Sequence, residues 1–148
     1  MEEDVAIHLT DNLRIIPFQV PHRNEFSETV GFKVQSPTQS FLYIPDIDSW
    51  DKWDEDINNL IRSNDVLLLD GTFFNDEELA DRNVQDVPHP FIYESLQKFS
   101  LLEEVERRKV YFTHLNHTNP AIKILSPERS LLINQGCHIA EDGMVFSL

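Results

Sequence analysis

Several residue types are scarce in this chain of 148 residues, and each shortage argues against a class of protein. Cys137 is the single cysteine, so the chain can form neither an internal disulfide nor a zinc site of several cysteines. Only four glycines occur, none in a phosphate-binding pattern, and no Gly-x-Ser-x-Gly nucleophile elbow is present. No apolar run approaches the ~20 residues that a transmembrane helix needs.

Basic residues are also scarce. The chain has 12 Lys and Arg against 26 Asp and Glu, which gives a formal net charge of −14. Such a charge repels phosphate, so we expect no nucleic-acid partner and no attachment to an anionic membrane. The acidic start at residues 1–4 is unlike a secretory signal. With 41% hydrophobic residues and ten Phe, the chain can build a core, and we predict a soluble, cytoplasmic domain.

The pattern of apolar residues predicts strands first and then alternating strands and helices. Strands are expected over 5–9, 13–20, 29–35, 41–44, 66–69 and 110–113, with a last hairpin over 139–148. Helices are expected over 50–61, 91–105 and from Ser126 to Gly136, and residues 74–88 are expected to form a loop. The predicted fold class is therefore α/β, or α+β with a mixed sheet, because the opening hairpins do not suit a purely parallel sheet.

Four of the predicted apolar strands are followed by residues that can bind a metal or move a proton. These residues are His22, Asp46, Asp70 and His114. In open α/β sheets, ligands bind beyond the carboxyl ends of the strands. If the four residues meet at one edge, they form a mixed nitrogen and oxygen site, which suits zinc, iron or manganese.

Each of these residues also has a purely structural interpretation. An aspartate after a strand often caps a turn, as Asp70 would at Gly71 and Thr72, and a lone His22 is more often structural. His114 and His117, three residues apart at a strand end, are a stronger metal signal, although one of them could only bind backbone. For His89, which lies between two prolines, we favour a place at the start of the next helix over the rim of an active site.

Several segments, in the same order along the chain, resemble metallo-β-lactamase-fold proteins of the PQQ biosynthesis protein B group. They are VPHRNEFSETVGF from Val20, YIPDIDSW from Tyr43, LLDGTFF from Leu68, PHPFI from Pro88, FTHLNHTNP from Phe112 and AEDGMVF from Ala140. The sharpest element is THLNHTNP, and together the segments extend over nearly the whole chain.

The resemblance implies an αββα sandwich with a metal site at one sheet edge. By position, His22, Asp46 and His114 match metal ligands of that superfamily, and we expect Asp70 and His117 to orient ligands or substrate in catalysis. The implied cofactor is a divalent metal, iron or zinc. The implied activity is hydroxylation of a tyrosine in a peptide-derived precursor, so the expected substrate is a small molecule or short peptide.

One departure from the superfamily pattern is important. The signature His-x-His-x-Asp-His, which belongs to the N-terminal half of the fold, does not occur here. We therefore expect residues 1–148 to form a single partial domain, the C-terminal half of the sandwich, which would form a homodimer or associate with the missing N-terminal half. Two alternatives stay open: a hydrolase of the same fold acting on phosphodiesters or cyclic esters, and a remnant without enzymatic activity.

Overall fold

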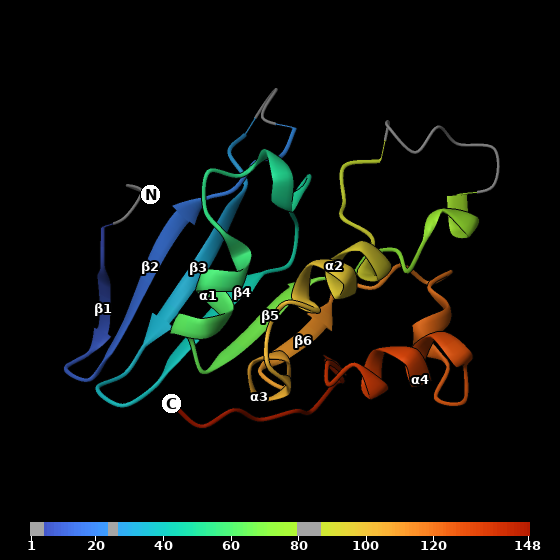
Figure 1. The fold of residues 1–148 in the computed structure, drawn as a ribbon. Coiled ribbons are helices and arrows are strands. Elements are labelled where there is room, and N and C mark those ends of the chain that lie inside the picture. The colour runs from blue at the N-terminus through green and yellow to red at the C-terminus, as the bar shows by residue number, and fades with distance from the viewer. Residues whose placement is uncertain (1–4, 24–26, 80–86) are drawn as a thin grey trace.

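A seven-stranded mixed sheet organises the computed structural model, which describes residues 5–23, 27–79 and 87–148 (Figure 1). The strands are β1 (Ile7–Thr10), β2 (Leu13–Gln19), β3 (Val30–Gln35), β4 (Ser40–Ile44), β5 (Val66–Asp70), β6 (Val110–Thr113) and β7 (His138–Ile139), and their order in the sheet is their order in the chain. Neighbours from β1 to β4 are antiparallel, and neighbours from β4 to β7 are parallel. The predicted mixed sheet with opening hairpins is confirmed.

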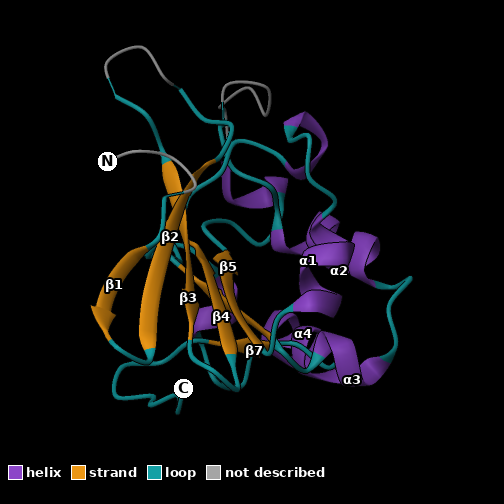
Figure 2. Cartoon of the chain, turned by 90° about the vertical axis from the view of Figure 1, so that its left-hand side faces the viewer, coloured by secondary structure: helices purple, strands orange, loops and turns teal. Residues whose placement is uncertain are grey.

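The helices lie on one side of this sheet (Figure 2). They are α1 (Ile57–Ser63), α2 (Ile92–Phe99), α3 (Glu104–Arg107) and α4 (Pro127–Asn134), with short 3₁₀ helices η1 (Trp50–Lys52), η2 (Asp76–Leu79) and η4 (Pro120–Ile122). Successive parallel strands need crossover connections of one hand, which places successive helices on the same face. None of the described helices is long and apolar enough to cross a membrane.

The core fills the layer between the helices and the sheet. The sheet contributes the fully buried Leu42, Ile44, Leu67, Leu69, Val110 and Phe112, and the helices contribute Ile57, Ile61, Ile92, Leu96 and Phe99. The rings of Phe99 and Phe112 stack with centroids 6.3 Å apart. This continuous apolar layer holds the ends of β4, β5 and β6 in fixed positions.

The opposite face of the sheet is covered by no described helix. The strand register places Ile15, Pro17, Phe32, Val34, Phe41, Tyr43, Val66, Leu68, Tyr111 and His138 on this face, which we call the open face. Apart from Asp70 at its edge, none of the register positions on the open face from β2 to β7 is Asp, Glu, Lys or Arg. The C-terminal segment reaches it through Phe146, whose ring contacts Phe41 and Tyr111.

Three predicted elements differ from the structure. The helix expected over 50–61 is divided into η1 and α1, because the Asp56 side chain accepts a hydrogen bond from the Asn58 backbone N–H and begins a new helix. The helix expected over 91–105 ends at Phe99, and α3 follows separately. In place of the last hairpin there is only β7, since the following segment packs Phe146 on the sheet.

The expected loop over 74–88 includes η2, and its residues 80–86 lie outside the described residues.

Cys137 is a core residue, as predicted, and its thiol should not react in the folded protein. Its side chain is 0% exposed, and burial raises the pKa of the Cys137 thiol to about 12 despite the nearby charge of Arg107. At pH 8 only on the order of one thiol in ten thousand is then ionised, against roughly a quarter for an ordinary cysteine. We expect Ellman's reagent to label Cys137 only after unfolding in urea. Rapid labelling of the native protein at pH 8 would contradict this burial.

Candidate metal centre

Four potential ligand groups meet at the edge of the sheet where β4, β5 and β6 end. Asp46, Asp70, His89 and His114 each offer one ligand atom, and these atoms all lie within 4.8 Å of one another. Asp46 follows β4 by two residues, Asp70 is the last residue of β5, and His114 directly follows β6. Parallel strands bring their carboxyl ends to one edge, so this convergence follows from the topology.

His22, from the segment after β2, lies beside this cluster. Its Nε2 atom is 3.5 Å from Oδ2 of Asp46, and its ring centroid is 6.0 Å from that of His89. The Nδ1 atom of His22 and the Oδ1 atom of Asp46 are buried, and among the described residues neither has a hydrogen-bond partner. Unsatisfied buried nitrogen and oxygen atoms beside further imidazole and carboxylate groups fit a bound divalent cation.

Asp70 is fully buried and accepts hydrogen bonds on both carboxylate oxygens. Its Oδ2 accepts from the backbone N–H of Ile47 at 3.1 Å and contacts Nδ1 of His89 at 2.8 Å. Its Oδ1 accepts from the backbone N–H of Thr72 at 2.9 Å and from the Thr72 hydroxyl at 2.7 Å. Asp70 therefore does cap the turn after β5, and the same carboxylate also orients an imidazole of the cluster.

His89 is part of the cluster, so the sequence-based preference for a helix-start residue over a residue of the active-site rim is wrong. The residue does precede α2, but its ring turns toward the strand ends, where Nδ1 is also 3.5 Å from Oδ1 of Asp46. The flanking prolines gave no sign of this contact. The available signal was the segment PHPFI, which carries part of the family resemblance and contains His89.

The charge state of His89 reflects opposing effects. Burial disfavours the charged ring and lowers the pKa of His89. The hydrogen bond with Asp70 and the negative charges of Asp70, Asp46 and Asp48 act in the other direction and prevail, so the pKa is raised above its ordinary value. The hydrogen bond with the buried carboxylate therefore favours the protonated ring of His89, which can serve as a proton donor.

His114 has an unusual backbone conformation. Its φ is +60°, and it is the single non-glycine residue of the described chain with a positive φ. The left-handed region is costly for residues with a Cβ atom, and such strain is common at functional sites. The side chain of Asn119, five residues further along the chain, ties this segment to the turn after β5, because its Nδ2 donates to the Gly71 carbonyl at 2.9 Å and to the Thr72 carbonyl at 3.3 Å.

His117 lies outside the four-residue cluster. Its ring is exposed, and its Nδ1 lies 3.0 Å from Oδ1 of Asn116. The structure thus brings together three of the strand-end residues, places His22 beside them, and leaves His117 at the surface. A contact of His117 with substrate stays a prediction.

Gly71 leaves no room for a side chain between the strands that carry Asp70 and His114. A Cβ atom at Gly71 would lie 2.8 Å from Cβ of Phe112 and 3.1 Å from the carbonyl oxygen of Thr113. We expect Gly71→Ala to lower the free energy of unfolding by about 1–3 kcal/mol through overpacking. Urea denaturation would measure it, with Gly143→Ala as a second variant, because no atom lies within 4 Å of a Cβ there and only its positive φ opposes alanine. Equal stability of Gly71→Ala and the parent would contradict this packing.

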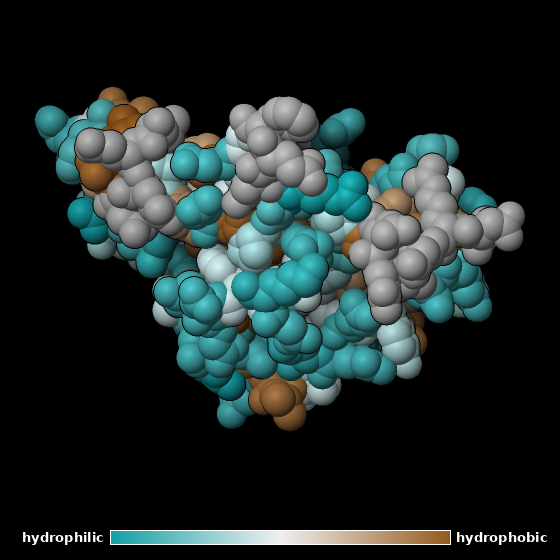
Figure 3. Space-filling model, turned by 90° about the horizontal axis from the view of Figure 1, so that it is seen from above, coloured by the Kyte–Doolittle hydropathy of each residue, from teal (hydrophilic) through white to brown (hydrophobic). Residues whose placement is uncertain are grey.

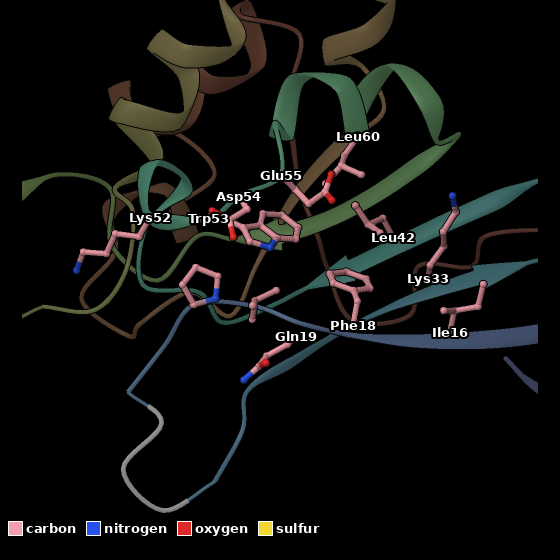
Figure 4. A pocket seen from close by; sticks show the side chains of 12 residues that line it. Ile16, Phe18, Gln19, Lys33, Leu42, Lys52, Trp53, Asp54, Glu55 and Leu60 are labelled. Carbon is pink, nitrogen blue, oxygen red and sulfur yellow. The ribbon is translucent and has the colours of Figure 1, made fainter. Parts of the chain in front are cut away.

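A separate hollow of about 600 Å³ lies between β2, β3, β4 and the segment from η1 to α1 (Figure 4). Phe18 and Trp53 stack in it with centroids 5.8 Å apart, and Lys33 and Glu55 add charge of both signs. None of the four cluster residues lines this hollow.

Seen from the top of Figure 1, the described surface is mainly hydrophilic (Figure 3).

The strand order, the helices on one face and the cluster at the sheet edge together define a metallo-β-lactamase fold. Residues 1–115 match the family described as beta-lactamase superfamily domain, and the chain belongs to this family. Within it, the chain is similar to coenzyme PQQ synthesis protein B. The protein of that name from Pseudomonas savastanoi pv. phaseolicola is 29% identical, with 100% of this chain and 54% of the relative covered. The one from Klebsiella pneumoniae (strain 342) is 30% identical, with 74% of this chain and 36% of the relative covered.

Solved structures show the same fold. Zn²⁺-bound PqqB from Methylobacterium extorquens superposes with a TM-score of 0.79 at 23% identity, covering 100% of this chain and 51% of that protein. The short form of human tRNase Z gives a TM-score of 0.60 at 15% identity, covering 96% of this chain and 44% of that protein. The chain thus spans about half the length, or less, of the relatives it matches.

Proposed function

We propose that this chain supplies ligands to a divalent-metal centre of the kind found in coenzyme PQQ synthesis protein B, and that the centre acts in making that coenzyme. The observation that carries the proposal is the cluster of Asp46, Asp70, His89 and His114, whose ligand atoms lie within 4.8 Å of one another. His22, Asp46 and His114 would hold the metal. This assignment is supported by one buried atom each of His22 and Asp46 that has no hydrogen-bond partner among the described residues. Zinc and iron both accept such nitrogen and oxygen ligands.

The finer proposal is hydroxylation of a tyrosine in a small or peptide-derived precursor. Bound iron would supply reactivity toward dioxygen; one oxygen atom enters the ring, and two electrons from a reductant convert the other to water. Asp70 keeps the His89 ring in place through the 2.8 Å contact, and His89 can accept or return a proton at the substrate. His117 would contact the substrate from the exposed rim of the site.

A second candidate function is metal-dependent hydrolysis of a small phosphodiester or cyclic ester. The observation that favours it is the pairing of His89 with the buried Asp70, because a leaving group that departs in hydrolysis needs such a proton donor. The net charge of −14 counts against RNA as the substrate.

Metal titration tests the common part of the proposal. The protein, prepared metal-free, is titrated with Zn²⁺ and, without oxygen, with Fe²⁺, and bound metal is measured by elemental analysis. We expect saturable binding that approaches one metal per chain only at excess metal, and its loss in Asp46→Asn. Asp54 is exposed and lies outside the cluster, so Asp54→Asn is a matched control that should retain the metal. Equal binding by the parent and Asp46→Asn would refute the assignment.

Product analysis separates the two candidate reactions. The iron-loaded protein is incubated with a tyrosine-containing precursor peptide, a reductant and dioxygen, and in parallel with a chromogenic phosphodiester. A product heavier by one oxygen atom supports hydroxylation, whereas release of the chromophore supports hydrolysis. If neither product forms in the metal-loaded protein, the chain has no enzymatic activity of these two kinds.

The proposal includes a second sheet layer packed against the open face. Ile15, Phe32 and Leu68 lie on this face, and the register puts no charge among them. Relatives of the same fold are about twice as long, so we propose that the N-terminal half of the fold packs against the open face. We expect the chain alone to bind metal weakly and to self-associate, which light scattering after size-exclusion chromatography would detect. A monomer that holds one metal tightly would contradict it.

A further inference from the structure

We propose that Thr72 is a positioning residue that fixes the tautomer of His114 and so presents Nε2 of that ring to the metal. The inference rests on the proposed metal centre and concerns a residue that is not itself one of the ligands. Its basis is the Thr72 hydroxyl, which contacts three members of the cluster at once. Oγ1 of Thr72 lies 2.7 Å from Oδ1 of Asp70, 3.2 Å from Nδ1 of His89 and 3.1 Å from Nδ1 of His114.

The direction of these hydrogen bonds follows from the groups involved. Each oxygen of Asp70 already accepts from a backbone N–H, that of Thr72 on Oδ1 and that of Ile47 on Oδ2, so the carboxylate acts as an acceptor on both sides. The single hydroxyl proton of Thr72 therefore points to Asp70 along the shortest contact. The Thr72 oxygen is left as an acceptor toward the imidazoles.

An acceptor at 3.1 Å requires a proton on Nδ1 of His114. In the neutral ring the other nitrogen, Nε2, then carries the lone pair, and a lone pair is what a metal ligand must offer. Among the described residues, no other side chain forms a hydrogen bond with the His114 ring that would select this tautomer. Thr72 thereby links the buried charge of Asp70 to the ligand character of His114.

The backbone around Thr72 is held firmly enough for such a role. Thr72 is 7% exposed, and its carbonyl oxygen accepts from the Asn116 backbone N–H at 2.9 Å and from Asn119 at 3.3 Å. Both donors follow His114 in the chain, so the turn after β5 and the turn after β6 are tied together. These hydrogen bonds hold the backbone of Thr72 beside the turn that carries His114.

Nitrogen NMR of the metal-free chain tests the tautomer directly and needs no variant. Long-range proton–nitrogen spectra distinguish a protonated ring nitrogen from one that carries a lone pair. We expect His114 to show a protonated Nδ1 and an unprotonated Nε2 at a pH where the ring is neutral. A His114 ring with its proton on Nε2 would overturn the inference, whatever the metal affinity.

Two variants then connect the tautomer to metal binding. Thr72→Val removes the hydroxyl at nearly constant shape, and Thr72→Ser keeps it. We expect Thr72→Val to weaken Zn²⁺ binding by about 10–100-fold and to lose the Nδ1–H preference, and Thr72→Ser to stay within about threefold. Thr118→Val is the matched control, because the Thr118 hydroxyl donates to Glu78 and accepts from the Asn116 side chain, and neither of these hydrogen bonds involves a histidine.

The outcomes separate this inference from the proposed function. Equal Zn²⁺ affinity of Thr72→Val and the parent overturns the inference and leaves the metal centre standing. A parent that binds no Zn²⁺ refutes the metal centre, and the NMR spectrum still decides the tautomer. Weak Zn²⁺ binding in Thr72→Val, together with parental binding in Thr72→Ser and Thr118→Val, supports both the role of Thr72 and the metal centre.

Discussion

Asp70→Ala is expected to lower the free energy of unfolding by about 3–5 kcal/mol, the largest stability effect of any single change at the site. The variant leaves the backbone N–H groups of Ile47 and Thr72, the Thr72 hydroxyl and the His89 ring without their shared acceptor in a buried place. Removing one member of a buried, charged hydrogen-bond network lowers stability by this amount, because the remaining polar groups stay buried without hydrogen-bond partners. Urea denaturation of the metal-free protein measures it.

The same variant should weaken Zn²⁺ binding by at least about tenfold, since His89 and, through Thr72, His114 lose their orientation. Asp54→Asn is a suitable control, because Asp54 is exposed, and its stability should stay within about 0.5 kcal/mol of the parent. If Asp70→Ala unfolds within about 1 kcal/mol of the parent, the buried network contributes far less than its geometry indicates.

His114→Gly is expected to reduce metal affinity by about 100-fold or more without the stability loss that accompanies His114→Ala. Both changes remove the imidazole, but the φ of +60° at this position suits glycine and strains alanine. The metal-free glycine variant should therefore be more stable than the alanine variant by about 1 kcal/mol. Zinc competition titration and thermal unfolding give the two quantities independently.

His8→Ala serves as the control for His114, because His8 lies exposed on the edge strand β1 and outside the cluster. It should bind Zn²⁺ as the parent does. Parental affinity in His114→Gly would show that His114 is not a ligand, whereas equal stability of the glycine and alanine variants would show that the turn carries no strain.

The sheet and the meeting of strand-end residues could be predicted from the sequence. Buried parallel strands such as Val66–Asp70 appear as unbroken apolar runs, and the residues that follow them must meet at one edge. Periodicity also placed Trp50 in the core, where it is 6% exposed and donates from Nε1 to Ser95. Periodicity could not show that the helix is interrupted, because the apolar side chains on both sides of the break lie on one buried face. The interruption occurs where Asp56 caps the start of α1.

The part of the site that sequence reasoning missed depends on long connections. His89 belongs to no strand, and its position is set by the path between β5 and α2, which no local pattern encodes. The spacing of His114 and His117 suggested a shared role, but the left-handed turn at His114 changes the chain direction and leaves His117 at the surface. Tertiary placement of loops therefore decides which histidines meet.

The identity of strand order and chain order has a consequence for how the protein is made. Each strand from β2 onward pairs with the strand that left the ribosome immediately before it. The meander of β1 to β4 closes short loops and can form early, and each later crossover adds one strand to an edge that is already present. We therefore expect the sheet to grow during synthesis from the N-terminal side. Asp46, Asp70 and His114 would reach the common edge in that order, so that the metal-binding constellation is assembled only when β6 is added.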